Sequence, residues 1–118
     1  MNKYVFSYDT QTLRNPPHTH EDVKKVIIRF LLLNGVIPTN IKEPVATTIT
    51  FKSTLTTNDL IELIENNLVR DLRRMMANVF YYFASIKVDV NGNFYEKVRP
   101  DNVLQTNFET LINQVLNE

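Results

Sequence analysis

Asp9 is the first carboxylate of the chain, and it follows directly on a short run of alternating residues, Tyr4–Tyr8. A carboxylate at the end of a strand can bind Mg²⁺ or Mn²⁺ through oxygen, and the ion can then polarise a phosphoryl group or activate water. One carboxylate supplies few ligands, so a shared metal would require two copies of Asp9 to converge in a homodimer. Alternatively, Asp9 accepts hydrogen bonds from amides of the following loop.

His18 and His20, followed by Glu21 and Asp22, form a second group with metal-binding side chains. A His-x-His pair can share a metal if its backbone is extended, and His20 could act as a general base. The spacing fixes no third ligand. The neighbouring Thr19 equally predicts the start of a helix that carries solvated histidines.

Positive charge is concentrated in two segments, and residues in them could contact the phosphates of RNA or DNA if they share one face of the fold. The alternative is a solvated helix surface, since arginine is favoured near a helix C-terminus. The residues are Lys24, Lys25, Arg29, Arg70, Arg73 and Arg74.

Four consecutive aromatic residues, Phe80–Phe83, could stack on bases, as aromatic side chains do on some RNA-binding sheets. The alternative is that they pack in the core or in a dimer interface. The sequence contains no glycine-rich phosphate loop, no Gly-x-Ser-x-Gly motif and no paired-histidine zinc helix, so we expect no organic cofactor.

The composition indicates one domain of ordinary globular character. The chain has 118 residues, 13 Lys and Arg against 13 Asp and Glu, and no cysteine. Zero net charge argues against a protein that clamps a duplex mainly through phosphates. The absence of cysteine excludes disulfides and thiolate zinc sites and is consistent with a reducing compartment. We see no signal-peptide pattern and no apolar run that could span a bilayer, so we expect a cytoplasmic protein without a membrane partner.

The N-terminal third predicts a strand, a loop and a helix. Lys3–Asp9 has a period of two and predicts a strand, and residues 10–19, with Asn15, Pro16 and Pro17, predict a loop. Thr19 is the predicted N-cap of a helix.

This helix has acidic residues in its first turn and an apolar stripe at helical spacing. It is predicted to end at Asn34-Gly35, where Gly35 suits a left-handed C-terminal cap. Residues 36–54 are extended, with Val45–Lys52 as the better strand, and Thr56 or Thr57 is predicted to cap the next helix.

Residues 68–83 admit two interpretations. Apolar residues at helical spacing could continue the helix as far as Phe83. Val79–Val90 is instead rich in β-branched and aromatic residues and precedes Asn91-Gly92, which is typical of a tight turn. We favour a helix that ends near residues 74–76 and a strand over about residues 79–90, followed by a hairpin strand at Phe94–Val98.

Asp101 or Asn102 is predicted to cap a last helix. The order β-α-β-β-α-β predicts an α+β fold of the ferredoxin-like kind, an antiparallel sheet with helices on one face, plus a C-terminal hairpin strand and helix. We expect a single domain, 1–118, with a core of about residues 1–90 and an extension at 91–118. The uncovered face of the sheet should carry aromatic residues and form a homodimer interface, since an apolar patch of that size is rarely left in water.

The first 90 residues resemble a small ferredoxin-like superfamily in the order of their elements and in a strand that ends in aspartate, Tyr4–Asp9. The similarity continues through the helix Glu21–Asn34, the strand Val45–Lys52, the helix after Thr57, and Ser85–Asp89. The members of this superfamily include the second CRISPR-associated protein, which has reported nuclease activity, and the virulence-associated protein D ribonucleases.

The resemblance implies a homodimeric, metal-dependent endonuclease that acts on RNA or DNA, with Asp9 as catalytic residue and as ligand of Mg²⁺ or Mn²⁺. Only Asp9 is carried over from the resemblance. The expected nucleic-acid contacts come from the charge pattern of the sequence itself and are Arg70, Arg73, Arg74, Lys24 and Lys25. The alternative function is a non-catalytic module of the same fold that binds a protein partner or regulates nucleic-acid machinery.

Overall fold

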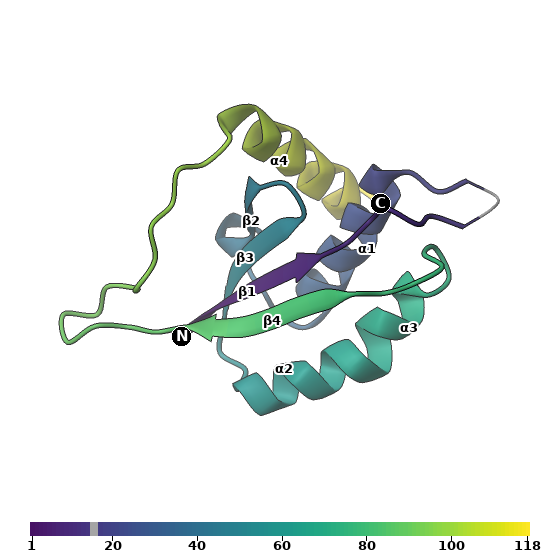
Figure 1. Ribbon diagram of the computed structural model, residues 1–118. Helices are drawn as coiled ribbons and strands as arrows, with labels where there is room; N and C mark the ends of the chain where they lie inside the picture. Colours follow the sequence, from purple (N-terminus) through teal and green to yellow (C-terminus); the bar gives the residue numbers. More distant parts are fainter. Residues whose placement is uncertain (15–16) are drawn as a thin grey trace.

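The computed structural model describes residues 1–14 and 17–118, and within them the chain forms a four-stranded antiparallel β-sheet. The strands are β1 (Asn2–Tyr8), β2 (Lys42–Val45), β3 (Thr48–Ser53) and β4 (Tyr81–Ile86), in the spatial order β2-β3-β1-β4 (Figure 1). β1 therefore lies inside the sheet, between β3 and β4. The predicted α+β class is confirmed. Asn15 and Pro16, which belong to the predicted loop, lie outside the described residues.

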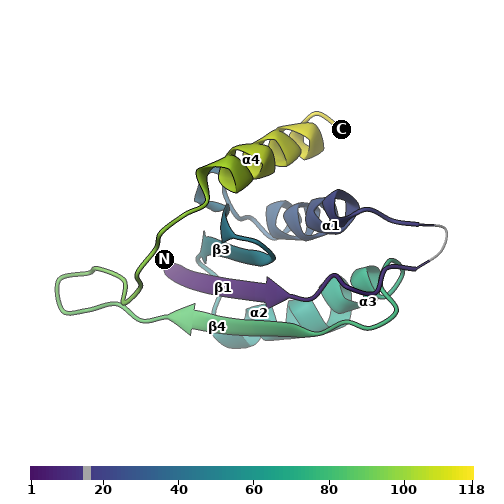
Figure 2. The ribbon, with the colours of Figure 1, turned by 45° about the horizontal axis from the view of Figure 1, so that its top comes forward.

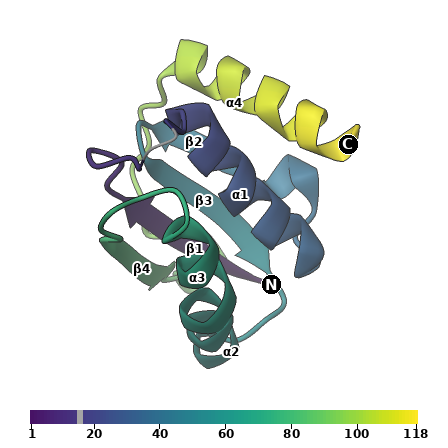
Figure 3. The same cartoon turned by 90° about the vertical axis from the view of Figure 1, so that its right-hand side faces the viewer.

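The helices gather on one face of this sheet (Figure 3). They are α1 (His20–Leu33), α2 (Thr57–Leu63), α3 (Val69–Leu72) and α4 (Asn102–Leu116), with a short 3₁₀ turn, η1 (Pro38–Asn40). α4 packs beside α1 and against β2, so the C-terminal extension is joined to the same core (Figure 2). Among the described residues, no helix combines the length and the apolar character needed to cross a membrane.

The alternating side chains of β1 divide the two faces of the sheet. Tyr4, Phe6 and Tyr8 face the helices and are buried. They are joined there by aromatic residues of β4, with ring centroids 5.3 Å apart for Tyr4–Phe83 and 5.5 Å apart for Phe6–Tyr81. The uncovered face does carry two exposed aromatic residues, Phe80 and Tyr82, whereas the aromatic residues of β1 lie under the helices, which cover the face with the larger apolar area.

Three predicted helix N-caps are present. Thr19 and Asp22 form a reciprocal capping box at the start of α1. Thr56 Oγ1 accepts from Asp59 N at 3.2 Å, and Asp101 Oδ1 accepts from Leu104 N at 3.1 Å. Each side chain satisfies an amide that has no partner inside its helix.

The predicted C-terminal cap of α1 is also present. Gly35 adopts a φ of 83°, and its N–H donates to Leu32 O at 3.1 Å. A residue with a Cβ rarely adopts this left-handed conformation, which explains the glycine.

Between α2 and α3, Ile64–Leu68 forms a π-helical turn, η2, so one helical path runs from Thr57 to Leu72. Residues 73–75 then form a turn, and β4 follows. The helix therefore ends slightly before the predicted residues 74–76, and its continuation to Phe83 is wrong. Strand pairing of β4 with β1 prevails over helical spacing there, because it buries Tyr81 and Phe83 against β1.

The predicted hairpin strand at Phe94–Val98 is not formed. A single bridge joins Val88 to Phe94 around the tight turn at Gly92, which has a φ of 83°. The chain then leaves the hairpin and runs to α4, and Glu96 forms an ion pair with Lys3 on the way. The predicted strand over 79–90 is likewise shorter, since β4 ends at Ile86.

Candidate functional site: a groove between two helices

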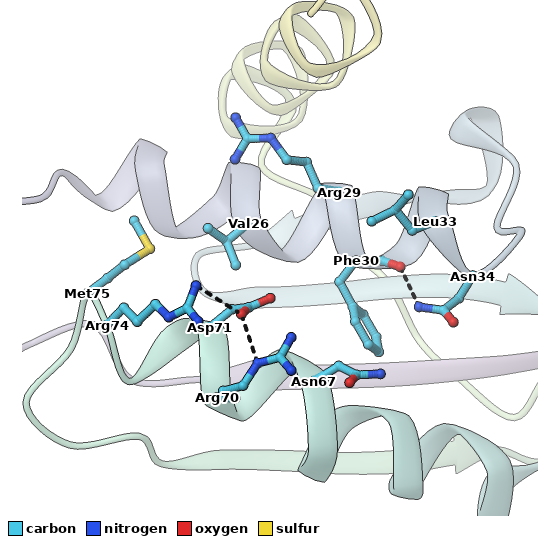
Figure 4. Close-up of a pocket in the computed structure, with 10 residues that line it drawn as sticks. All are labelled: Val26, Arg29, Phe30, Leu33, Asn34, Asn67, Arg70, Asp71, Arg74 and Met75. Atoms are coloured by element: carbon cyan, nitrogen blue, oxygen red, sulfur yellow. Dashed lines mark hydrogen bonds and ion pairs between the residues drawn. The ribbon is translucent and has the colours of Figure 1, made fainter.

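A groove of about 530 Å³ lies between α1 and the helical path η2–α3 (Figure 4). We call it the interhelical groove. It is lined by Val26, Arg29, Phe30, Leu33, Asn34, Asn67, Arg70, Asp71, Arg74 and Met75.

Two arginines of α3 and the turn after it provide the positive charge of the groove. Arg70 Nε lies 3.3 Å from Asp71 Oδ1, and Arg74 NH1 lies 3.8 Å from the same oxygen. Both arginine side chains remain more than half exposed. Exposed ion pairs of this kind contribute little to stability, so an anion can compete with Asp71 for both arginines at small cost.

Arg29 also borders the groove, but its guanidinium points toward α4 (Figure 4). There it binds the side-chain carboxylate of Glu118 through Nε, at 2.8 Å, and through NH2. These hydrogen bonds raise the pKa of Arg29 and lower the pKa of Glu118. The guanidinium of Arg29 is therefore paired with Glu118 at the end of the chain. Arg70 and Arg74 are the arginines whose charge faces the groove.

The walls combine apolar and amide groups. Phe30 projects between the two helices (Figure 4). Asn67 lies in the π-helical turn η2, and such turns occur frequently at functional sites. Asn34 donates from Nδ2 to Phe30 O at 2.8 Å, and this hydrogen bond fixes the Asn34 side chain at the end of α1. The groove can thus accept an apolar ring on its walls and an anion at the α3 side.

No protein-family model, curated protein sequence or solved structure matches this chain. The side chains of the site are therefore the basis on which a function can be proposed.

The basic residues predicted from the sequence are not all brought together. Arg70 and Arg74 line the groove, whereas Arg73, between them, is exposed and lies outside its lining. Lys25 is also outside the lining. Lys24 points to another part of the fold, where it forms an ion pair with Glu43.

Asp9 lies just beyond β1, half-buried, next to the edge strand β4. Its Oδ1 accepts from Gln11 N at 2.9 Å, and its own N–H donates to Phe80 O at 3.1 Å. This is the local turn geometry that an aspartate after a strand adopts. One carboxylate with an oxygen already bonded is a weak protein site for Mg²⁺, so water, a substrate phosphate or a second copy of the chain would have to supply the other ligands.

In the histidine group, Thr19 and Asp22 rather than the histidines cap the helix α1. Asp22 Oδ2 accepts from Thr19 N at 3.0 Å, and this hydrogen bond lowers the pKa of Asp22. His18 is half-buried and His20 begins α1. Within residues 1–14 and 17–118, no three His, Asp or Glu side chains are close enough together to hold a metal.

A buried polar cluster lies near the end of β1, and the sequence did not indicate it. Glu43 is fully buried, 2.9 Å from Lys24 Nζ, and accepts from Thr47 N at 3.2 Å. Burial and the charge of Glu43 raise the pKa of Tyr8 well above its usual range. Among the described residues no group hydrogen bonds with the Tyr8 hydroxyl.

Three polar residues of these sites were missed by the sequence reasoning: Asn67, Asp71 and Glu43. Asn67 and Asp71 are ordinary polar residues in a helical pattern, and the π-helical turn that places Asn67 has no sequence signal we can identify. Glu43 stands between Lys42 and Pro44, a context typical of a solvated loop. Its burial depends on α4, which packs against β2, and on Lys24 of α1, which pairs with it.

Proposed function

We propose that this chain is a non-catalytic binding module for single-stranded nucleic acid, RNA or DNA, and that the interhelical groove is its contact surface. The observation that carries the proposal is the pair of exposed guanidinium groups, Arg70 and Arg74, at one side of a groove whose other walls are partly apolar. Arginine can meet phosphate through two parallel hydrogen bonds and can also stack on a base.

The size of the groove supports a single-stranded rather than a duplex ligand. About 530 Å³ is within the range of roughly 300–1,000 Å³ that is typical of sites for small organic groups. One unstacked nucleotide could place its base against the apolar wall formed by Val26, Leu33 and the small exposed part of Phe30, and its phosphate at Arg70 and Arg74. Recognition of single-stranded bases by stacking and by arginine is common, and it requires no basic surplus over the whole chain.

The fold proposed for this module is the ferredoxin-like, split βαβ plan. The element order β1-α1-β2-β3-α2-β4 and the strand order β2-β3-β1-β4 with antiparallel neighbours support it. α4 is then an addition that packs against α1 and β2.

The test is fluorescence anisotropy with labelled single-stranded RNA and DNA of the same mixed sequence. We expect wild-type protein to bind, and Arg70→Ala with Arg74→Ala to weaken binding at least tenfold. Arg73→Ala is the matched control, since it removes an exposed arginine of the same turn outside the groove. Equal losses in both variants, or no binding by the wild type, would reject the proposal.

A second candidate function is metal-dependent cleavage of RNA or DNA by a homodimer, with Asp9 as catalytic residue and as ligand of Mg²⁺ or Mn²⁺. The observation that favours it is the position of Asp9 immediately after the strand β1, which lies inside the sheet. It requires two Asp9 carboxylates to share an ion, with oxygen–metal distances of roughly 2–2.6 Å. Divalent-ion-dependent cleavage that is abolished by Asp9→Asn would support this function over simple binding.

A further inference from the structure

The two edges of the sheet differ in how they are protected. At the β2 edge, Glu43 N–H donates to Gln105 Oε1 at 2.7 Å and Pro44 O accepts from Asp101 N at 2.8 Å, so α4 and its cap cover that strand. The opposite edge is β4. It is paired on one side only, with β1, and no strand follows it in the sheet order.

The hydrogen bonds between β1 and β4 show which backbone groups of β4 point away from the sheet. Asp9 N–H donates to Phe80 O, and Tyr8 N–H donates to Thr47 O on the opposite side of β1. Because the direction of backbone groups alternates along a strand, Tyr82 and Ala84 face β1, while Tyr81, Phe83 and Ser85 direct their N–H and C=O groups away from it. Among residues 1–14 and 17–118, no other segment forms a backbone hydrogen bond with these three residues.

The sequence of this edge carries none of the usual protective features. Phe80–Ile86 reads FYYFASI and contains no charge, no proline and no glycine. Natural edge strands usually avoid association through lysine, proline, bulges or covering segments. Two large apolar side chains on the uncovered face of this edge, Phe80 and Tyr82, are 63% and 65% exposed.

We propose that β4 is a homodimer interface, in which two copies of β4 pair antiparallel about a two-fold axis at Phe83 and join the two sheets into one. The edge is self-complementary in this register. Phe83 pairs with Phe83 and Tyr81 with Ser85, which supplies about six backbone hydrogen bonds, two for each closely spaced pair.

The side chains on the uncovered face also fit this register. Tyr82 of one copy faces Ala84 of the other, so a large ring lies opposite a small side chain. Phe80 faces Ile86, an aromatic–β-branched pair of the kind that stabilises antiparallel sheets. The exposed side chains Phe80 and Tyr82 thereby each gain a cross-strand neighbour from the second copy, and the unpaired backbone groups of the edge gain hydrogen-bond partners.

This dimer is incompatible with a metal shared by two Asp9 side chains. Asp9 lies opposite Phe80, three residues from the axis and one strand further from it. With about 3.3 Å per residue and about 4.8 Å between strands, the two Asp9 Cα atoms would be roughly 25 Å apart. Confirmation of the β4 dimer would therefore exclude the shared-metal function but leave the groove of each copy accessible to its ligand.

The first test is the mass in solution by sedimentation velocity. We expect wild-type protein to have twice the 13.8 kDa of one chain. Tyr82→Lys with Ala84→Lys should halve the mass, because the lysines face each other across the axis. Tyr82→Lys with Ala84→Glu should restore the dimer through opposite charges, and Val103→Lys, on exposed α4 surface, should leave it unchanged. Far-UV circular dichroism checks that each variant is folded.

The second test fixes the register by disulfide cross-linking, since the chain has no cysteine of its own. A mixture of the Tyr82→Cys and Ala84→Cys proteins should form a covalent dimer under oxidation, whereas each protein alone should not. A monomeric wild type, a Lys–Lys variant that remains dimeric, or a Tyr82→Cys protein that cross-links with itself would each overturn the proposal.

Discussion

Lys24 Nζ lies 2.9 Å from Oε1 of Glu43, and this glutamate is fully buried. The pair joins the first turns of α1 to the edge strand β2, and Thr47 N donates to the other carboxylate oxygen at 3.2 Å. A buried carboxylate is tolerated in a core only with such partners, because desolvation disfavours its charged form.

We predict that Lys24→Ala lowers the free energy of unfolding by about 3 kcal/mol, because it leaves Glu43 buried without its cation. Lys25→Ala, at the next position on α1, should change the free energy of unfolding by less than about 0.5 kcal/mol. Urea denaturation followed by circular dichroism measures both. If Glu43→Gln in the Lys24→Ala background restores none of the loss, the ion pair is not its cause.

The salt dependence of nucleic-acid binding tests the roles of Arg70 and Arg74. Each phosphate contact on a single strand contributes roughly −0.7 to the slope of log affinity against log salt. The double variant Arg70→Ala, Arg74→Ala should therefore reduce that slope by about 1.4, since two such contacts are lost. Anisotropy titrations at several salt concentrations provide the slopes, and a reduction by Arg73→Ala instead would place the contact outside the groove.

Asp9 should behave as a turn residue if the chain is a binding module. Asp9→Ala removes the acceptor of Gln11 N–H and should lower the free energy of unfolding by about 1 kcal/mol. Asp9→Asn keeps an acceptor oxygen and should cost less. Both variants should bind nucleic acid as the wild type does, and loss of binding or of a metal-dependent cleavage activity would instead assign chemistry to this carboxylate.

Thr47 has a φ of 59°, an unfavourable conformation for a β-branched residue, and it lies in the turn between β2 and β3. Thr47→Gly should raise the free energy of unfolding by about 0.5 kcal/mol, because relief of the left-handed strain exceeds the cost of the extra flexibility that glycine gives the unfolded chain. Ala46→Gly is the control. Ala46 does not have a positive φ, so glycine at this position relieves no strain and only adds flexibility to the unfolded chain. Thermal denaturation should therefore shift in opposite directions for the two variants.

The capping box of α1 predicts a dependence on pH. The pKa of Asp22 is lowered from its usual value of 3.8 by the hydrogen bond with Thr19 N. The charged form thus stabilises the fold above pH 3.8, and this contribution is lost as the pH falls through the lower, folded-state pKa. The acid part of the stability profile should be shallower in Asp22→Asn. Thr19→Ala should cost about 1 kcal/mol at neutral pH.

Local patterns in the sequence determined the caps and the faces of the secondary structure. Thr19, Thr56, Asp101 and Gly35 could be assigned because caps depend on a few adjacent residues and on backbone conformation. The alternation in β1 predicted a strand for the same reason. Residues 68–83 admit two interpretations from sequence, because helical spacing and β-branched composition point to different structures, and pairing with β1 decides between them.

Only the tertiary structure decided which charged residues act together. Six basic residues are candidates for phosphate contact. The packing of α1 against α3 places Arg70 and Arg74 in one groove, whereas the position of α4 brings Glu118 to Arg29 and the position of β2 brings Glu43 to Lys24. These side chains are distant in sequence, and their distances depend on how the helices lie on the sheet. The bare edge of β4 has the same origin, since strand order is a property of the whole sheet and not of any segment.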